Sequence, residues 1–324
     1  MPTPPLISIA LCTYDGERFL RPQLDSLLGQ DHEALEVVAV DDASRDGTWA
    51  ILESYAARDR RLRIFRNPEN LGFRRNFERA MGLCWGQLVA PSDQDDVWRS
   101  DKLRLLSAAL GSSAAIYADS ELVDAQGAPL GRRLSQLLPL RPIADPAGFL
   151  FDNCVAGHAL LFRRSLLERA LPVPEGVFHD WWLAFVAAGA GGVGYWPEAL
   201  VLYRQHASSV TDVARLQVSR SKGRPRGHAL ARLEAEELRL RACSAFLGGQ
   251  GDGLVEEAVG LWLERKDRYL CPRLASFMVR HRRRLFANKP GTRLSHLREA
   301  LKLFWGLRLK RLVQPHDYGR AARG

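Results

Sequence analysis

Residues 7–42 read ISIALCTYDGERFLRPQLDSLLGQDHEALEVVAVDD. The apolar runs at residues 7–11 and 35–40 have the length and the β-branched side chains of buried strands. Between them, apolar side chains recur at helical spacing from about residue 17 to residue 28. A strand, a helix and a second strand joined by short loops are typical of a parallel sheet with helices on both faces.

The alternation of strand and helix continues to about residue 110 and then changes. The further predicted elements are a helix after Asp46, strands at 61–65 and 88–90, a helix at 73–83, strands near 116–122 and 159–162, and a helix from about 180. Together they predict an α/β domain over residues 1–215 with a mostly parallel sheet and flanking helices.

The last third of the chain differs from the rest in charge and in periodicity. Residues 215–324 contain 25 Lys or Arg and 10 Asp or Glu, a net charge of +15, whereas residues 1–214 contain 21 and 27, a net charge of −6. A basic segment, SRSKGRPRG at 219–227, precedes apolar residues at helical spacing. We therefore expect residues 216–324 to form a basic helical extension that faces an anionic partner.

Composition and cysteine placement exclude several classes of protein. With 46% hydrophobic and 26% charged residues among 324, the chain is neither collagen-like nor disordered. Its five scattered cysteines form no CxxC pair, which argues against a disulfide framework or a zinc site and favours a reducing compartment. The longest apolar stretch, residues 181–196, is short and glycine-rich, and no basic segment precedes the first apolar run. We expect neither a membrane span nor a signal peptide, and a cytoplasmic or peripheral membrane location.

Polar side chains cluster where three of the predicted strands end. Thr13 and Tyr14 follow the first strand, Asp41 and Asp42 follow the second, and the run from Asp93 to Asp96 follows the fourth. Ligands of parallel α/β sheets bind beyond the carboxyl ends of the strands. The three clusters therefore predict one common binding site.

Asp93, Asp95 and Asp96 place three carboxylates within four residues. Their mutual repulsion favours a bound cation, and hard oxygen ligands suit Mg²⁺ or Mn²⁺, which usually also bind substrate phosphates. The sequence contains no GxxxxGK[ST] loop, which argues against P-loop nucleoside triphosphatases. No GxGxxG follows the first strands, which argues against dinucleotide-dependent oxidoreductases. The indicated substrate is a phosphate ester or a diphosphate.

Five segments in this order resemble the family 2 glycosyltransferases of the GT-A fold. They are VVAVDDASRDGT at 37–48, NPENLGFRRNFERAM at 67–81, APSDQDDVW at 90–98, HDWWLA at 179–184 and YRQH at 203–206. The SDQDDVW and HDWW forms are similar to bacterial rhamnosyltransferase-like members that build surface polysaccharides. The resemblance covers about residues 6–210 and leaves out the basic extension.

The resemblance implies a nucleotide-binding role for several residues at the strand ends. They are Thr13, Tyr14, Asp41, Asp42, Arg75, Asp93 and Gln94. Thr13 and Tyr14 match the loop that lies against the base, and Asp42 matches the acid that hydrogen-bonds uracil or thymine. The implied donor is a UDP- or dTDP-sugar.

The resemblance also implies where the metal and the chemistry lie. Asp95 and Asp93 match the DxD pair, and His206 matches a histidine near the metal or the diphosphate. Asp180 matches the general base of an inverting transfer, in which an acceptor hydroxyl attacks the anomeric carbon. Trp181 and Trp182 would form a platform for a glycan or lipid-linked glycan acceptor.

The residues alone leave other interpretations open. Asp180 could cap a helix, and because Trp181 and Trp182 are consecutive, at least one is expected in the core. A metal-dependent nucleotidyltransferase could use a similar acidic cluster, and a basic tail could bind nucleic acid, although no nucleic-acid motif occurs. The apolar and basic residues at 294–312 fit either a helix at an anionic membrane surface or one packed on the catalytic domain.

Overall fold

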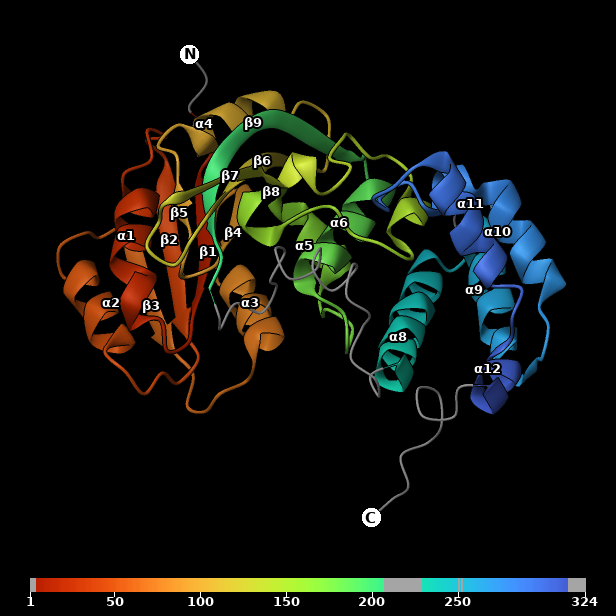
Figure 1. Ribbon diagram of the computed structural model, residues 1–324. Coiled ribbons are helices and arrows are strands. Elements are labelled where there is room, and N and C mark those ends of the chain that lie inside the picture. Colours follow the sequence, from red (N-terminus) through yellow and green to blue (C-terminus); the bar gives the residue numbers. More distant parts are fainter. Residues whose placement is uncertain (1–3, 207–228, 250, 252, 314–324) are drawn as a thin grey trace. The chain divides into compact units, whose positions relative to one another are not determined.

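The computed structural model describes residues 4–206, 229–249, 251 and 253–313 (Figure 1). The chain divides into two compact units. Unit 1 comprises residues 1–146, 154–173 and 178–211, and unit 2 comprises residues 147–153, 174–177 and 212–324. The predicted boundary between residues 215 and 216 and the predicted linker at 219–227 lie outside the described residues.

Unit 1 is built on one curled sheet with helices packed on it (Figure 1). Its strands are β1 (Ile7–Thr13), β2 (Leu35–Asp41), β3 (Leu62–Arg66), β4 (Leu88–Ser92), β5 (Val97–Trp98), β6 (Ala115–Val123), β7 (Pro129–Arg133), β8 (Leu160–Arg163) and β9 (Val193–Arg204). Its helices are α1 (Glu17–Leu28), α2 (Thr48–Ala56), α3 (Phe73–Gly82), α4 (Lys102–Ala109), α5 (Leu167–Ala170) and α6 (His179–Gly189). The strand order is β3-β2-β1-β4-β8-β6-β9-β5, and β7 pairs with β6.

The apolar pattern of the sequence explains the first half of this sheet. β1 and β2 are buried along their whole length, as expected for parallel strands covered on both faces. Helix α1 buries Leu20, Leu24 and Leu27, which recur at helical spacing, in the same core. Strands β1 to β4 pair in parallel, so their carboxyl ends share one edge.

The predicted α/β fold class is confirmed, but the sheet is more mixed than expected. Strand β8 runs antiparallel between β4 and β6, and β5 is antiparallel to β9. The sequence pattern did not predict β5, β7 or β9. Gly194 and Pro197 interrupt the apolar alternation of β9, yet β9 pairs with β6 along nearly its whole length.

Unit 2 is helical in its described part, as predicted for the basic extension. Its helices are α8 (Ala229–Leu247), α9 (Leu254–Glu264), α10 (Pro272–Leu285), α11 (Arg293–Lys302) and α12 (Leu307–Val313). Buried side chains from all five of them form its core, among them Leu240, Val255, Trp262, Met278, Ala300 and Leu307. None of the helices in the described ranges is long and apolar enough to cross a membrane.

The single helix predicted over residues 294–312 is wrong. Helix α11 ends at Lys302, and α12 begins only at Leu307. Gly306 lies against the chain at residues 268–269, where its N–H donates to the Tyr269 carbonyl at 2.8 Å and a Cβ atom would collide with the Arg268 carbonyl. This tertiary contact breaks the helix at a residue that only glycine fits.

Candidate active site

Two distant parts of unit 1 meet at the carboxyl ends of the strands. The Arg204 N–H donates to Asp96 Oδ1 at 3.0 Å, and the Arg204 Nε donates to the Asp95 carbonyl at 2.7 Å. His206 follows, and its Nε2 lies 2.6 Å from Asp95 Oδ2. The end of β9 thus brings His206 into contact with the acidic loop, although 111 residues separate it from Asp95, and its role at a metal or diphosphate stays a prediction.

A buried lysine and a buried histidine lie beside this loop, and the sequence pattern predicted neither. Lys102, at the start of α4, donates from Nζ to the His158 carbonyl at 2.6 Å. Its Nζ also lies 2.9 Å from the centroid of the Trp98 ring. The His158 Nδ1 lies 3.6 Å from Asp96 Oδ2, and its Nε2 lies 2.9 Å from Ser120 Oγ. Nothing in the polar run RSDKLR at 99–104 distinguishes this lysine from a solvated one.

The packing of these groups shifts their proton affinities. Burial, and then the negative charges of Asp95 and Asp180, raise the pKa of the Asp93 carboxyl to about 7. Burial also raises the pKa of Asp96 well above its usual range and lowers the pKa of Lys102 well below its own. The site therefore concentrates negative charge that one buried lysine only partly offsets.

The donor set fits a divalent cation. Asp93, Asp96 and His158 each offer a ligand atom within 4.8 Å of the others, and Asp96 Oδ2 is buried without a hydrogen-bond partner among the described residues. Carboxylate oxygens with one imidazole are ligands suited to Mn²⁺ and, with more water, to Mg²⁺. His158 therefore lies close to the carboxylates of Asp93 and Asp96. The predicted ligand His206 contacts Asp95 instead.

Asp180 lies in the first turn of α6, where sequence allowed either a helix cap or a base. Its Oδ1 accepts from the Trp181 N–H at 2.6 Å, and the Gly157 N–H also stabilises the carboxylate. Burial outweighs these donors and raises the pKa of Asp180 to about 6. A Cβ atom on Gly157 would lie 3.0 Å from His179 Nε2 and 3.3 Å from Asp180 Cβ, so this glycine permits the close approach.

The two tryptophans after Asp180 point into different surroundings. Trp182 is buried, 4% exposed, and donates from its indole N–H to the Ala170 carbonyl at 2.7 Å. Its predicted place in an acceptor platform is corrected, because the helix turns this side chain into the core. Trp181 is half-buried, so the platform prediction now rests on Trp181 alone.

Gln94 connects the acidic loop to the loop after β1. The Tyr14 N–H donates to Gln94 Oε1 at 2.8 Å, and Gln94 Nε2 donates to the Tyr14 carbonyl at 3.0 Å. The Tyr14 side chain itself is exposed. Both polar atoms of the Gln94 amide are therefore bonded to the backbone of Tyr14. These bonds hold the exposed Tyr14 ring near the acidic loop.

Thr13 and Asp41 are buried and hydrogen-bond one another, with Thr13 Oγ1 donating to Asp41 Oδ1 at 3.1 Å. Asp41 also accepts from the Ser44 hydroxyl and the Ser44 N–H, and Arg66 Nε lies 3.2 Å from its Oδ2. The direct contact with a base that the resemblance implied is corrected to a supporting role, because both side chains are occupied inside the protein.

Asp42 and Arg75 differ in their surroundings. Asp42 accepts from Asn67 Nδ2 at 2.5 Å and from the N–H groups of Leu71 and Gly72 at 2.9 Å, so it fixes the loop before α3. Arg75 is exposed on α3 and has no side-chain partner within the described part of the chain. The nucleotide-binding roles of both residues stay predictions.

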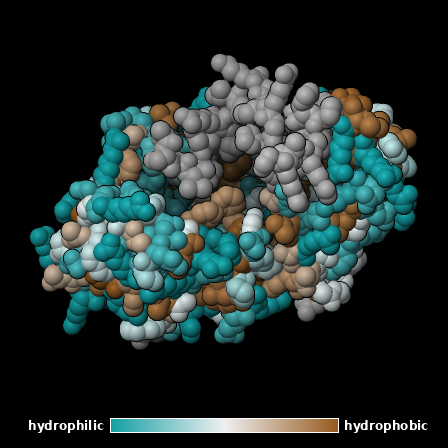
Figure 2. Space-filling model, turned by 90° about the horizontal axis from the view of Figure 1, so that it is seen from below, coloured by the Kyte–Doolittle hydropathy of each residue, from teal (hydrophilic) through white to brown (hydrophobic). Residues whose placement is uncertain are grey.

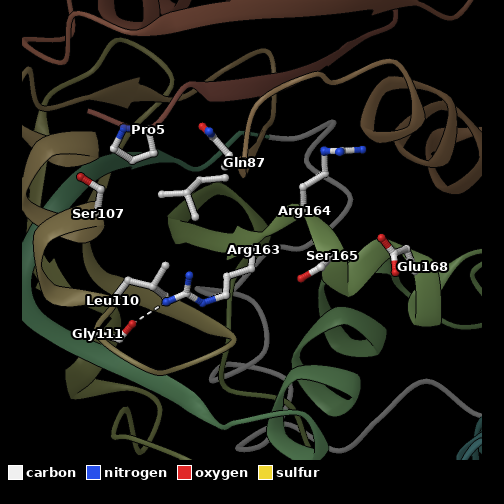
Figure 3. A pocket seen from close by; sticks show the side chains of 10 residues that line it. Pro5, Gln87, Ser107, Leu110, Gly111, Arg163, Arg164, Ser165 and Glu168 are labelled. Atoms are coloured by element: carbon white, nitrogen blue, oxygen red, sulfur yellow. Dashed lines mark hydrogen bonds between the residues drawn. The ribbon is translucent and has the colours of Figure 1, made fainter. Parts of the chain in front are cut away.

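A cavity of about 400 Å³ lies at the other edge of the sheet (Figure 3). Its lining includes Pro5 before β1, Leu88 at the start of β4, and Arg163 at the end of the antiparallel β8. The Arg163 guanidinium donates to the carbonyls of Gly111 and Ser113 at 2.5 and 3.0 Å. It therefore holds the turn that follows α4. This cavity is therefore separate from the acidic cluster at the carboxyl ends.

The sequence of this chain also matches a known protein family. Residues 8–171, more than half of the chain, match the family model described as glycosyl transferase family 2. The chain belongs to this family. Membership confirms the resemblance and favours glycosyl transfer over the nucleotidyltransferase and nucleic-acid-binding interpretations.

Relatives and solved structures support the family and the fold. An uncharacterized glycosyltransferase of Haemophilus influenzae is 26% identical over 229 residues, covering 64% of this chain and 68% of its own. The putative teichuronic acid biosynthesis glycosyltransferase TuaG of Bacillus subtilis is 35% identical over 99 residues, covering 31% and 39%. The crystal structure of Staphylococcus aureus TarS 1–349 in complex with UDP-GlcNAc matches with a TM-score of 0.59 at 18% identity, covering 95% of this chain and 83% of that one. That structural likeness confirms the GT-A-type fold alone.

Proposed function

We propose that this glycosyltransferase moves a sugar from a UDP- or dTDP-sugar to a hydroxyl of a glycan, with inversion at the anomeric carbon. The TarS neighbour binds UDP-GlcNAc, and TuaG bears the name of a polysaccharide pathway, so the proposed setting is surface-polysaccharide assembly. The SDQDDVW and HDWW motifs make rhamnose the proposed sugar. The observation that carries the proposal is the acidic loop after β4, where Asp93 and Asp96 offer ligand atoms within 4.8 Å of His158 and where His206 Nε2 lies 2.6 Å from Asp95.

The donor would bind across the carboxyl ends of β1, β2 and β4. Tyr14 offers an exposed ring for the base, and Asp42 offers a carboxylate for its polar edge. Arg75 supplies an exposed guanidinium, which suits a diphosphate because it can donate two parallel hydrogen bonds. Asp93 is the proposed ribose partner.

The proposed cation is Mg²⁺ or Mn²⁺, held by Asp95 and Asp93 with His206. Asp96 and His158 offer further ligand atoms within 4.8 Å of Asp93. When bound, such an ion neutralises charge on the departing nucleoside diphosphate. Lys102 is buried close to Asp93 and Asp96, and their negative charges favour its protonated form, although burial lowers its pKa.

Asp180 is the proposed general base. It takes the proton of the acceptor hydroxyl as that oxygen bonds to the anomeric carbon and the bond from that carbon to the diphosphate oxygen breaks. The N–H groups of Trp181 and Gly157 fix the carboxylate in position. A pKa of about 6 leaves Asp180 ionised at neutral pH and makes it a stronger base than a solvated aspartate.

The proposal is tested by incubating the purified chain with a panel of nucleotide sugars, with and without Mn²⁺, and measuring thermal stabilisation and nucleoside diphosphate release. NAD and ATP serve as control nucleotides. We expect metal-dependent stabilisation with UDP or dTDP compounds, and a product of inverted anomeric configuration by NMR. Pyrophosphate release from a nucleoside triphosphate, or a product that retains configuration, would contradict the proposal.

A further inference from the structure

Unit 2 exposes large apolar side chains on α11, on α12, on the segment before α10 and on the turn between α11 and α12. We call this surface the tail face; its apolar residues are Tyr269, Leu270, Leu294, Leu301, Trp305, Leu312 and Val313. Leu294, Trp305 and Val313 are 67%, 49% and 69% exposed. In Figure 2, brown hydrophobic residues lie among hydrophilic ones on the surface shown.

Backbone hydrogen bonds bring part of the tail face together. The Cys271 N–H donates to the Phe304 carbonyl at 2.7 Å, and the Gly306 N–H donates to the Tyr269 carbonyl at 2.8 Å. Leu270 therefore pairs with Trp305 across a short antiparallel bridge. The two aromatic rings and one leucine at this turn come from segments more than thirty residues apart in sequence.

The rest of the tail face lies along α11 and α12. Leu294 and Leu301 are seven residues apart, so they occupy the same side of α11, while Ala300 faces the core of unit 2. Leu312 and Val313 are exposed on the last turn of α12. Leu294 and Leu301 are thus not packed on the core of unit 2, so packing within this unit does not account for these two leucines.

Cations surround these apolar residues. Residues 293–313 contain six Lys or Arg and one acid, Glu299, which already pairs with Lys302 at 2.5 Å. The Arg308 guanidinium lies 5.6 Å from the centroid of the Tyr269 ring, and Arg311 is exposed one turn later. The tail face is therefore both apolar and strongly positive.

We propose that the tail face binds the surface of an anionic lipid bilayer. Leucine and valine side chains enter the acyl boundary, tyrosine and tryptophan rings suit the headgroup level, and Arg and Lys remain with anionic headgroups. A nucleic acid would use the cations but leave Leu294, Leu301 and Leu312 in water. This binding goes beyond sugar transfer, because it places the enzyme where lipid-linked glycans are found.

The proposal is tested by flotation of the full chain with vesicles of phosphatidylcholine alone or of phosphatidylcholine mixed with phosphatidylglycerol. We expect retention only on the mixed vesicles and release at high salt. Removing two charges in Arg308→Gln/Arg311→Gln should lower retention about 30-fold, since each basic side chain near such a surface contributes about 1 kcal/mol. The apolar variant Leu301→Gln/Trp305→Ser should also lose retention, at unchanged net charge.

Matched variants on unit 1 serve as controls. Leu130 is 45% exposed on β7, and Arg58 is exposed after α2, so Leu130→Gln and Arg58→Gln should bind vesicles like the unaltered chain. Thermal melting of every variant checks folding. Absence of retention on the mixed vesicles would overturn the proposal, and so would retention that the tail-face variants leave unchanged. Salt-sensitive binding of a random oligonucleotide without vesicle binding would overturn it in favour of a nucleic-acid partner.

Discussion

The acidic strand-end site of unit 1 and the tail face of unit 2 use charge in opposite ways. In unit 1, the acidic loop with Asp95 and Asp96 is packed against His158, His206 and a buried Lys102, and short hydrogen bonds hold His206 and Lys102 in place. In unit 2, Arg308 and Arg311 stand in solvent among exposed leucines and aromatic rings. Enclosed charges act strongly and individually, whereas exposed charges act weakly and additively. The predictions below test this contrast.

The largest effect is expected at Asp180. Asp180→Asn keeps the size of the side chain but removes the proton acceptor, so sugar transfer should fall by a factor of about 10² or more. Donor binding, measured by calorimetry with the nucleotide sugar and Mn²⁺, should stay within about threefold. Asp31→Asn, at an exposed carboxylate paired with Arg104 on the surface, is the control and should stay active.

The next effect is on stability. Lys102→Met removes the hydrogen bond to the His158 carbonyl and the buried amino group that interacts with Asp93 and Asp96. We expect the free energy of unfolding to fall by about 2–4 kcal/mol, measured by urea denaturation without metal. Lys266→Met removes a surface pair with Glu237 and should cost less than about 1 kcal/mol. Equal losses in the two variants would contradict the view that enclosed and exposed charges differ.

A pH effect follows from Asp180. The general base must be ionised, and burial raises its pKa to about 6, so transfer should be constant near neutral pH and lost as the pH falls through about 6. Below that value kcat/KM should drop about tenfold per pH unit. A profile that stays flat down to pH about 4, the range of a solvated aspartate, would remove Asp180 from the role of base.

The smallest effects are expected on the tail face. Arg311→Gln alone should lower retention on phosphatidylglycerol-containing vesicles about fivefold. Because the side chain is exposed, its loss should change the free energy of unfolding by less than about 0.5 kcal/mol and leave sugar transfer to a soluble acceptor unchanged. A large loss of stability would show that Arg311 supports the fold of unit 2 instead of a partner.

The sequence predicted the first half of the sheet and the acidic loop well, for physical reasons. Strands β1, β2 and β4 are mostly apolar and buried, and their parallel pairing brings the residues that follow them to one edge. The ordered motifs singled out Asp180 and His206, whose roles stay predictions; in the structure His206 contacts Asp95.

The parts that were missed depend on tertiary contacts. Lys102 and His158 meet through a carbonyl contact between residues 56 positions apart, which no local pattern reveals. Trp181 and Trp182 look alike in sequence, and only the orientation of α6 places one in the core. Gly306 breaks the last helix because it touches Arg268, a contact that helical periodicity cannot indicate.

The most direct test measures nucleoside diphosphate release with a soluble acceptor glycan for three preparations: the unaltered chain, Asp180→Asn, and Leu301→Gln/Trp305→Ser. The account predicts that Asp180→Asn loses transfer by a factor of about 10² or more while the tail-face variant keeps it. An active Asp180→Asn enzyme, or a tail-face variant that cannot transfer to a soluble acceptor, would contradict the assignment of chemistry to the strand-end site and of partner binding to the tail face.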